Sequence, residues 1–168
     1  QDADGHDHDP TAPDNWTVPT PIYRNDATLI NVNKQLAATA SGGVGMSLDM
    51  TYFQDADGRS YYAWQQLGAT YIAKMDPKDP AHVTSSPVRI VTPEYAWNAA
   101  IAEGPNVTLR DGKLYLMFSG SGVGKTYTTG LAVADAAGSD LTDPASWTAL
   151  NYPSQKSGPF NGEMQLGP

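Results

Sequence analysis

The sequence predicts an all-β protein with many turns. Its 168 residues include nine Tyr, four Trp, thirteen Pro and sixteen Gly, and 17% of them are charged. This mixture is typical of short strands joined by turns rather than of a helical bundle. Two Asp-Gly pairs, ending at Gly58 and Gly112, each lie between aromatic and β-branched runs. Such a pair between alternating strands is a strong signal for a β-hairpin, so the chain is expected to hold at least two hairpins.

Each hairpin opens a unit that occurs twice. A further strand follows it, then a turn that contains Asp-Pro, and then a last strand. The predicted ranges are 69–75 and 127–134 for the third strand and 88–91 and 147–150 for the last strand. Repeating four-stranded units of about fifty residues are the signature of a β-propeller, in which each unit is one blade. A β-sandwich also has many short strands, but the repeated order of elements favours blades.

The same pattern divides the chain into parts of blades. We expect residues 1–35 to end one blade, residues 36–95 and 96–155 to form two further blades, and residues 156–168 to begin the next. The opening stretch 2–16 matches 135–148, because both carry Asp-Pro before Trp-Thr, so Trp16–Tyr23 is predicted to be a last strand. These middle blades cannot close a propeller, and open strand edges are prone to association. The remaining blades are therefore an expected partner, in the same protein or in a second polypeptide.

Composition excludes several classes of protein. The net charge of -8 opposes binding to nucleic-acid phosphates, which requires a basic face. No apolar run is long enough for a membrane helix, and without cysteine no disulfide or thiolate metal site is possible. Asn15 and Asn106 each begin an Asn-x-Thr sequon, the acceptor pattern for N-glycosylation. We therefore expect an extracellular, secreted protein.

Two carboxylates occupy matching places in the two units. Asp49 and Glu103 each lie nine residues before the turn glycine of their hairpin, on the first strand of the predicted blade. First strands line the central channel of a propeller, so the equal offsets predict both acids at one depth of a shared pit. Apolar neighbours and a nearby like charge raise the pKa of a carboxyl group, as a general acid requires.

At these residues the sequence resembles glycoside hydrolase family 43, whose members are five-bladed β-propeller enzymes. The matching stretches are SLDMTYFQDADGRSYYAW around Asp49 and EGPNVTLRDGKLYLMFSGSG, followed by YTTGLAVA, from Glu103 onward. The resemblance covers most of residues 36–150 and is closest to the arabinofuranosidase branches. It implies an inverting hydrolase in which Glu103 is the general acid and Asp49 modulates the pKa of that acid and orients it. The resemblance places the general base, an Asp, in the family's first blade, which we expect to lie outside this chain.

The resemblance also implies a substrate class. We expect release of α-L-arabinofuranosyl units from arabinan or arabinoxylan, so that the partner is a plant cell-wall oligosaccharide or polysaccharide. β-Xylosidase and endo-arabinanase are alternatives within the same family. No cofactor is expected to be required, and a structural calcium ion would be held by residues outside this chain. A non-catalytic carbohydrate-binding propeller is the alternative of another class, and it would not need Glu103.

Several side chains near the two acids are candidates for substrate contact. Aromatic faces suit the apolar surfaces of sugars, so Trp97, Phe53 and Tyr95 are candidate platforms, although packing between blades is the alternative. Three polar side chains follow the second strand of the later unit and are candidates for direct contact, with an ordinary surface loop as the alternative. They are Ser119, Ser121 and Tyr127.

Two motifs are misleading. SGSGVGKT, residues 119–126, nearly spells a phosphate-binding loop, but Ser119 stands where the first Gly belongs and a strand rather than a helix is expected next. DADGHD at the start resembles part of a calcium loop, but its Gly comes too early for that pattern. His6 and His8 alternate with Asp in that stretch, which would also suit zinc. A solvated acidic loop is the favoured interpretation, and no metal site is predicted.

Overall fold

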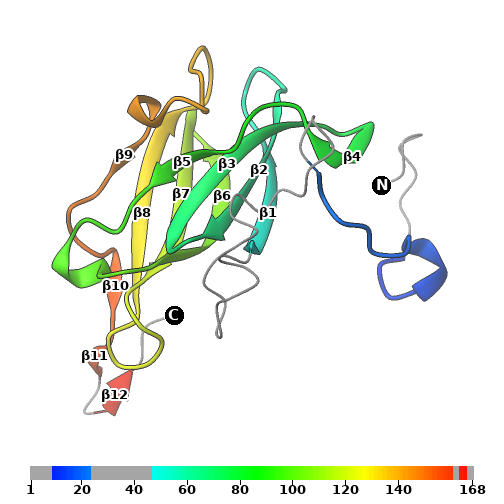
Figure 1. Ribbon diagram of the computed structural model, residues 1–168. Coiled ribbons are helices and arrows are strands. Elements are labelled where there is room, and N and C mark those ends of the chain that lie inside the picture. Colours follow the sequence, from blue (N-terminus) through cyan, green and yellow to red (C-terminus); the bar gives the residue numbers. More distant parts are fainter. Residues whose placement is uncertain (1–8, 24–46, 161–162, 166–168) are drawn as a thin grey trace.

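The computed structural model describes residues 9–23, 47–160 and 163–165, and within them two antiparallel sheets stand side by side (Figure 1). The strands of the first sheet are β1 (Leu48–Gln54), β2 (Ser60–Gln66), β3 (Ala69–Asp76), β4 (Asp79–Val83) and β5 (Val88–Val91). Those of the second are β6 (Ala102–Arg110), β7 (Lys113–Gly120), β8 (Thr128–Asp135), β9 (Thr148–Ala149) and β10 (Gln155–Lys156). A small third sheet pairs β11 (Gly158–Phe160) with β12 (Glu163–Gln165). The 3-10 turns are η1 (Pro13–Asn15), η2 (Ala96–Asn98) and η3 (Pro144–Ser146).

Both large sheets follow the same path, which confirms the repeated unit. Three strands form an antiparallel meander, β1-β2-β3 in one sheet and β6-β7-β8 in the other. The fourth position of each sheet is split between two short strands. β4 and β5 both pair with β3, and β9 and β10 both pair with β8. The sequence predicted β5 and β9 but missed β4 and β10, because Asp79-Pro80 was interpreted as a turn and two residues give no strand pattern.

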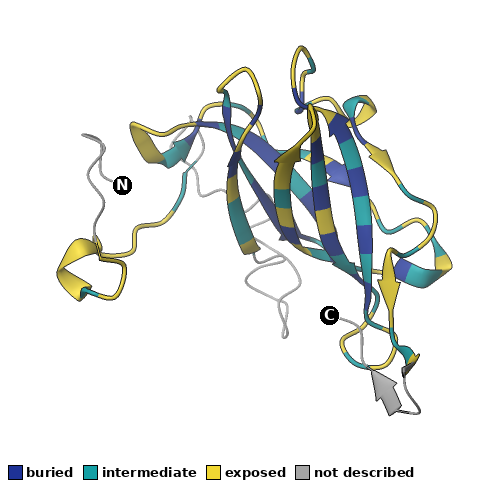
Figure 2. Ribbon diagram, turned by 180° about the vertical axis from the view of Figure 1, so that it is seen from behind, coloured by how far each residue is buried: buried dark blue, intermediate teal, exposed yellow. Residues whose placement is uncertain are grey.

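The core lies between the two sheets. On β7 and β8 buried side chains alternate with exposed or half-buried ones, as expected for strands with one covered face. β2 is buried along nearly its whole length. The core cluster joins side chains of both sheets, among them Tyr61, Ile72, Leu114, Leu116 and Phe118. Figure 2 shows this burial along the central strands, with exposed residues at the hairpin ends.

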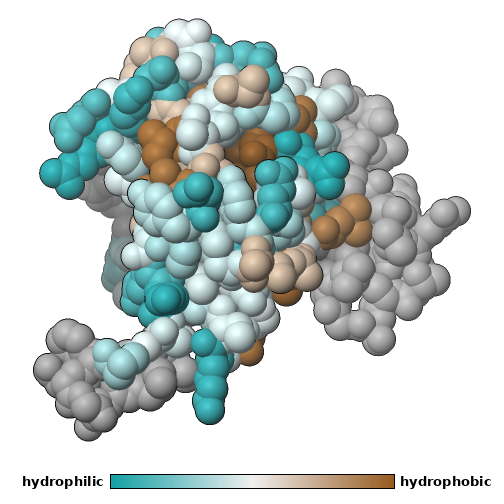
Figure 3. All heavy atoms as spheres, turned by 90° about the vertical axis from the view of Figure 1, so that its left-hand side faces the viewer, coloured by the Kyte–Doolittle hydropathy of each residue, from teal (hydrophilic) through white to brown (hydrophobic). Residues whose placement is uncertain are grey.

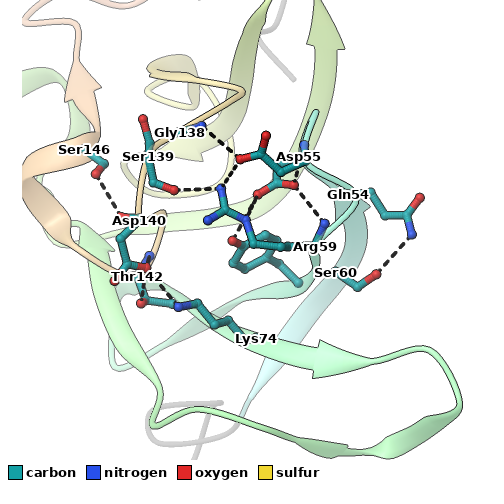
Figure 4. Close-up of polar contacts among 12 residues, drawn as sticks. Gln54, Asp55, Arg59, Ser60, Lys74, Gly138, Ser139, Asp140, Thr142 and Ser146 are labelled. Carbon is teal, nitrogen blue, oxygen red and sulfur yellow. Dashed lines mark hydrogen bonds and ion pairs between the residues drawn. The ribbon is translucent and has the colours of Figure 1, made fainter.

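A polar cluster ties the β1–β2 hairpin to the loop after β8 (Figure 4). The buried Asp55 carboxylate accepts from Arg59 Nε at 2.6 Å. The same guanidinium donates through Nη2 to the Ser139 carbonyl at 2.8 Å, and Gly138 N–H donates to Asp57 Oδ2 at 2.9 Å. Asp55 and Asp57 are turn residues, as the sequence indicated. They also fix one sheet against the other, and no local sequence pattern predicts this contact.

The free energy of unfolding is expected to fall between pH 10 and pH 12. Burial, and then the negative charge of Asp55, raise the pKa of Tyr61 to about 12. The folded protein therefore keeps this phenol neutral while the unfolded chain ionises it near the ordinary value of 10.0. The stabilisation is complete below pH 10 and is lost as the pH rises toward 12. Denaturant unfolding of Tyr61→Phe should show a flatter alkaline decline than wild type, whereas Tyr152→Phe, at an exposed site, should not. Equal declines in wild type and Tyr61→Phe would contradict this.

The segment Asp9–Trp16 repeats the local structure of Asp140–Trp147. In both copies the Asp carboxylate accepts from the backbone and hydroxyl of the Thr two residues on, a 3-10 turn follows, and the Trp indole donates to the carbonyl next to that Asp. The resemblance of the two stretches is thus confirmed, but Asp9 corresponds to Asp140 rather than to Asp143. Trp147 is 7% exposed and Trp16 is 66% exposed, so within the described part of the chain the indole of the second copy is packed and that of the first is not.

The rest of the opening segment differs from the prediction. Trp16–Tyr23 forms no strand, since Pro19 and Pro21 carry no N–H to donate. It makes one isolated parallel bridge, between Tyr23 and His82 of β4. The boundary at 35/36 and the acidic stretch with His6 and His8 lie outside the described residues. Among the described residues, no helix is long and apolar enough to cross a membrane.

Candidate active site

Two β-bulges at the same end of the two sheets carry the acids. On β1 the pairing passes from Leu48↔Gln65 to Thr51↔Ala63, so an extra residue enters at Asp49. On β6 it passes from Glu103↔Ser119 to Asn106↔Met117, with the extra residue at Gly104. Asp49 and Gly104 both have left-handed backbones, with φ of 56° and 59°. Bulges of this kind bend a strand and re-aim side chains, and they are frequent beside active sites.

When the two bulges are matched, Asp49 on β1 corresponds to Gly104 on β6, and Glu103 on β6 corresponds to Leu48 on β1. The two acids differ by one residue in depth and are not at one depth as the equal offsets predicted. β1 has seven residues and ends in a loop at 55–59, whereas β6 has nine and ends in the turn Asp111–Gly112. The first hairpin combines a shorter strand with a longer loop, so Asp49 and Glu103 lie the same number of residues before their turn glycines although they differ in depth.

Because of this one-residue difference in depth, Asp49 lies opposite the peptide unit that follows Glu103. Because the inner strands β1 and β6 lie against each other, Gly104 N–H reaches across and donates to Asp49 Oδ2 at 3.1 Å. The Asp49 carboxylate thus bonds the peptide unit that follows Glu103. Asp49 is exposed and Glu103 is half-buried, so both remain open to a ligand in this structure.

The Glu103 side chain has its own partner. Tyr127, just before β8, donates its phenolic O–H to Glu103 Oε1 at 2.5 Å. Burial, and then this hydrogen bond, raise the pKa of Tyr127 above its usual value, while a hydrogen bond from Ser119 acts in the opposite direction. Ser119 is also the cross-strand partner of Glu103. Ser119 and Tyr127, predicted as substrate contacts, therefore lie around the predicted general acid.

The β1–β5 sheet also fixes the backbone that leads to Glu103. Ala102 N–H donates to the Gly68 carbonyl at 2.8 Å, and the buried Thr70 hydroxyl donates to the Ala102 carbonyl at 3.1 Å. The sequence reasoning missed both residues. Leu67-Gly68 joins two adjacent strands and gives a turn signal only, and nothing in the sequence places that turn beneath the strand of the next blade.

The predicted aromatic platforms take part in packing. Phe53 is 6% exposed and stacks on Tyr61 with ring centroids 5.2 Å apart, so its faces lie in the core and not in the pit. Trp97 is half-buried between Tyr95 and Phe118, with centroids 6.0 and 6.2 Å away. Its indole N–H donates to the Asn151 carbonyl at 3.1 Å. For Phe53 in particular, the expectation of a sugar platform is not met, because a core strand requires its side chain.

Polar side chains dominate the face seen in Figure 3, with apolar groups visible in its upper part. A cavity of about 350 Å³ near Trp97 is lined in addition by Ser121, Lys125 and Lys156. The segment 121–127 forms a loop that enters β8 directly, which confirms the expectation that a strand rather than a helix follows the SGSGVGKT stretch. No cluster of metal-binding side chains occurs among the described residues.

The two candidate glycosylation sites lie in different settings. Asn15 is in η1 and donates through Nδ2 to the Asp9 carbonyl at 2.8 Å. Asn106 is exposed on β6, just beyond the bulge at Gly104. Its glycosylation stays a prediction, as does that of Asn15.

Fold and site together define a class: adjacent blades of a β-propeller whose inner strands bulge to present two carboxylates. The chain belongs to glycosyl hydrolases family 43, whose sequence model matches residues 31–166. It is 34% identical over 115 residues to an extracellular exo-α-(1→5)-L-arabinofuranosidase of Streptomyces chartreusis, over 64% of this chain and 34% of that protein. A protein with the same name from Streptomyces avermitilis is 33% identical over 132 residues, or 73% of this chain and 26% of that protein. The chain thus spans about a third or less of these relatives.

Solved structures agree with this assignment. An α-L-arabinofuranosidase from Lactobacillus brevis superposes with a TM-score of 0.61 at 29% identity, covering 67% of this chain and 39% of that one. An endo-arabinase from Bacteroides thetaiotaomicron superposes with a TM-score of 0.52 at 23% identity, covering 75% of this chain and 48% of that one. The fold is accordingly that of part of a five-bladed β-propeller, as the sequence predicted.

Proposed function

We propose that the protein containing this chain is an inverting glycosidase that releases α-L-arabinofuranosyl units from arabinan or arabinoxylan, with Glu103 as its general acid. The observation that carries the proposal is the pairing of the two acids at adjacent bulges, where Gly104 N–H joins the Glu103 strand to Asp49 at 3.1 Å. The similarity to proteins named as arabinofuranosidases supports this sugar. The extracellular names of the same relatives support a secreted protein.

The two acids have different tasks in this proposal. Protonated Glu103 gives its proton to the glycosidic oxygen as the bond from that oxygen to the anomeric carbon breaks. Water adds to the anomeric carbon from the opposite face, and its proton passes to a base. Asp49 acts by orientation: its carboxylate holds the Gly104 peptide and so fixes the backbone from which Glu103 projects.

We propose that the base is a carboxylate of another blade. Inverting enzymes place acid and base ~6.5–9.5 Å apart to leave room for the attacking water. Asp49 lies on β1, beside the strand of Glu103, and its carboxylate accepts from the Gly104 peptide next to that glutamate. This position suits an orienting group better than a base, which must act from the far face of the sugar. No cofactor enters any step.

Substrate preference and stereochemistry test the proposal together. The intact protein is expected to hydrolyse a nitrophenyl α-L-arabinofuranoside in preference to a nitrophenyl β-D-xylopyranoside, and to shorten arabino-oligosaccharides. Proton NMR early in the reaction should show the β anomer of arabinose first, because a single displacement inverts the anomeric centre. A preference for the xyloside would contradict the proposed sugar, and early appearance of the α anomer would contradict inversion. Absence of hydrolysis with binding retained would favour a carbohydrate-binding propeller.

A further inference from the structure

We propose that Tyr127 is a positioning residue that holds the general acid by Oε1 and leaves Oε2 of Glu103 to deliver the proton. This inference rests on the proposed function, because it assigns Tyr127 a task relative to Glu103. It differs from the sequence-based prediction, in which Tyr127 contacts the substrate.

The contact itself carries the inference. The Tyr127 hydroxyl donates to Glu103 Oε1 at 2.5 Å, in a partly buried place. A phenol has a single O–H to donate, and here Glu103 takes it, so Tyr127 has none left for a sugar hydroxyl. Hydrogen bonds to a carboxylate are short and stronger than those between neutral groups, so this contact strengthens as Glu103 gives up its proton. Tyr127 is therefore matched to the charge that develops on Glu103 rather than to a neutral sugar.

The residues before and after Tyr127 in the chain are both fixed within the β6–β10 sheet and its loop. Its own N–H donates to the Gly124 carbonyl at 3.1 Å. The next residue, Thr128, is buried and pairs with Gly120, and its hydroxyl donates to the Gly120 carbonyl at 3.1 Å. A Cβ on Gly120 would stand 2.7 Å from Asn98 Cβ, so the Gly120 backbone is tightly packed against Asn98. The ring of Tyr127 thus extends from a fixed point just before β8 toward Glu103 on β6.

Ser119 completes the arrangement from the strand between them. It pairs with Glu103 on β6 and with Thr129 on β8, which places it beside both strands of the Glu103–Tyr127 contact. Its interaction with the Tyr127 hydroxyl opposes the rise in the pKa of Tyr127. Burial raises the pKa of Tyr127 above its ordinary value. The phenol therefore stays protonated, and able to donate, throughout the pH range in which glycosidases work.

The fixed carboxyl group has a chemical consequence. The terminal torsion of a glutamate side chain is broad and nearly two-fold, so an unrestrained carboxyl group presents either oxygen to the substrate. With Oε1 held by Tyr127, the acidic proton resides on Oε2. In the reaction the Oε2–H bond breaks, a bond from that hydrogen to the glycosidic oxygen forms, and the negative charge left on the carboxylate is shared with the oxygen that Tyr127 already solvates. Tyr127 therefore acts on the chemical step and not on substrate binding.

Replacement of Tyr127 by Phe tests this in the intact protein. With an unactivated arabinofuranoside, kcat is expected to fall by about 10–100-fold, the range for losing one hydrogen bond to a charged group, while KM stays nearly constant. With a dinitrophenyl arabinofuranoside, whose leaving group departs without protonation, the fall should be much smaller. Tyr152→Phe is the matched control at an exposed tyrosine and should leave both substrates unaffected. A raised KM with unchanged kcat would overturn the proposal in favour of direct substrate contact.

Combination with Glu103→Gln separates this inference from the proposed function. If Tyr127 works through Glu103, adding Tyr127→Phe to Glu103→Gln should cost little more than Glu103→Gln alone. Fully additive losses would overturn the positioning role while leaving Glu103 as the acid. If Glu103→Gln alone leaves hydrolysis intact, the proposed function and this inference both fail.

Discussion

Glu103→Gln is expected to lower kcat/KM for an unactivated α-L-arabinofuranoside by ~10²–10⁴-fold, the usual contribution of a positioned general acid. Glutamine keeps the shape of the side chain and an oxygen that accepts from Tyr127, but it has no proton to give to the leaving oxygen. The measurement is steady-state hydrolysis of an arabino-oligosaccharide by the intact protein. Binding of the substrate should survive, so KM should change far less than kcat.

The control for this substitution is Glu94→Gln. Glu94 is an exposed glutamate in the stretch between β5 and η2, and its loss of charge should leave kcat/KM unchanged. Unfolding of both variants by denaturant should match wild type, because neither glutamate belongs to the core cluster. A Glu103→Gln variant that hydrolyses the oligosaccharide at the wild-type rate would remove Glu103 from the mechanism.

Gly68→Ala is expected to destabilise the fold and to disturb the site at once. Gly68 has φ +77°, and a Cβ there would stand 2.5 Å from the Ala100 carbonyl oxygen. A left-handed L-residue costs ~1–2 kcal/mol and overpacking adds ~1–3 kcal/mol, so the free energy of unfolding should fall by about 2–5 kcal/mol. Ala100 leads directly into the strand that carries Glu103, so we also expect kcat to fall.

Gly58→Ala separates the two causes. Gly58 has nearly the same backbone, with φ +78°, but no atom lies within 4 Å of a Cβ built on it. It should therefore lose only the ~1–2 kcal/mol of the left-handed conformation and keep full activity. The measurements are urea unfolding and hydrolysis for both variants. Equal losses of stability would show that the contact with Ala100 is not tight, and unchanged kcat in Gly68→Ala would show that the turn does not hold the site.

The blades were predictable because their signals are local. The Asp-Gly turns, the alternating strands and the 54-residue spacing between Gly58 and Gly112 each depend on neighbours in sequence, and all agree with the two sheets observed. The strand predicted at Trp16–Tyr23 is wrong for an equally local reason, since Pro19 and Pro21 have no N–H to donate to a sheet, despite the Trp-Thr match.

The sequence nominates the two acids of the candidate site but does not predict their relative geometry. Glu103 and Asp49 stand out by their place before the hairpins, yet their relative depth depends on bulges that no residue pattern shows. The hydrogen bonds that Ala102 makes with Gly68 and Thr70, and the one that Gly138 donates to Asp57, join residues of different blades. Such contacts arise from how one sheet packs against the next, so a count along the chain cannot find them. Phe53 was assigned to the pit for the same reason, although its strand requires it in the core.

The most direct test of the central claim, that Glu103 protonates the leaving oxygen, is the dependence of the Glu103→Gln defect on the leaving group. The ratio of kcat/KM between wild type and variant is measured for an arabino-oligosaccharide, whose sugar leaving group needs a proton, and for a dinitrophenyl α-L-arabinofuranoside, whose leaving group does not. Our account predicts a large ratio for the first substrate and a ratio near one for the second. Equal ratios for the two substrates would contradict it.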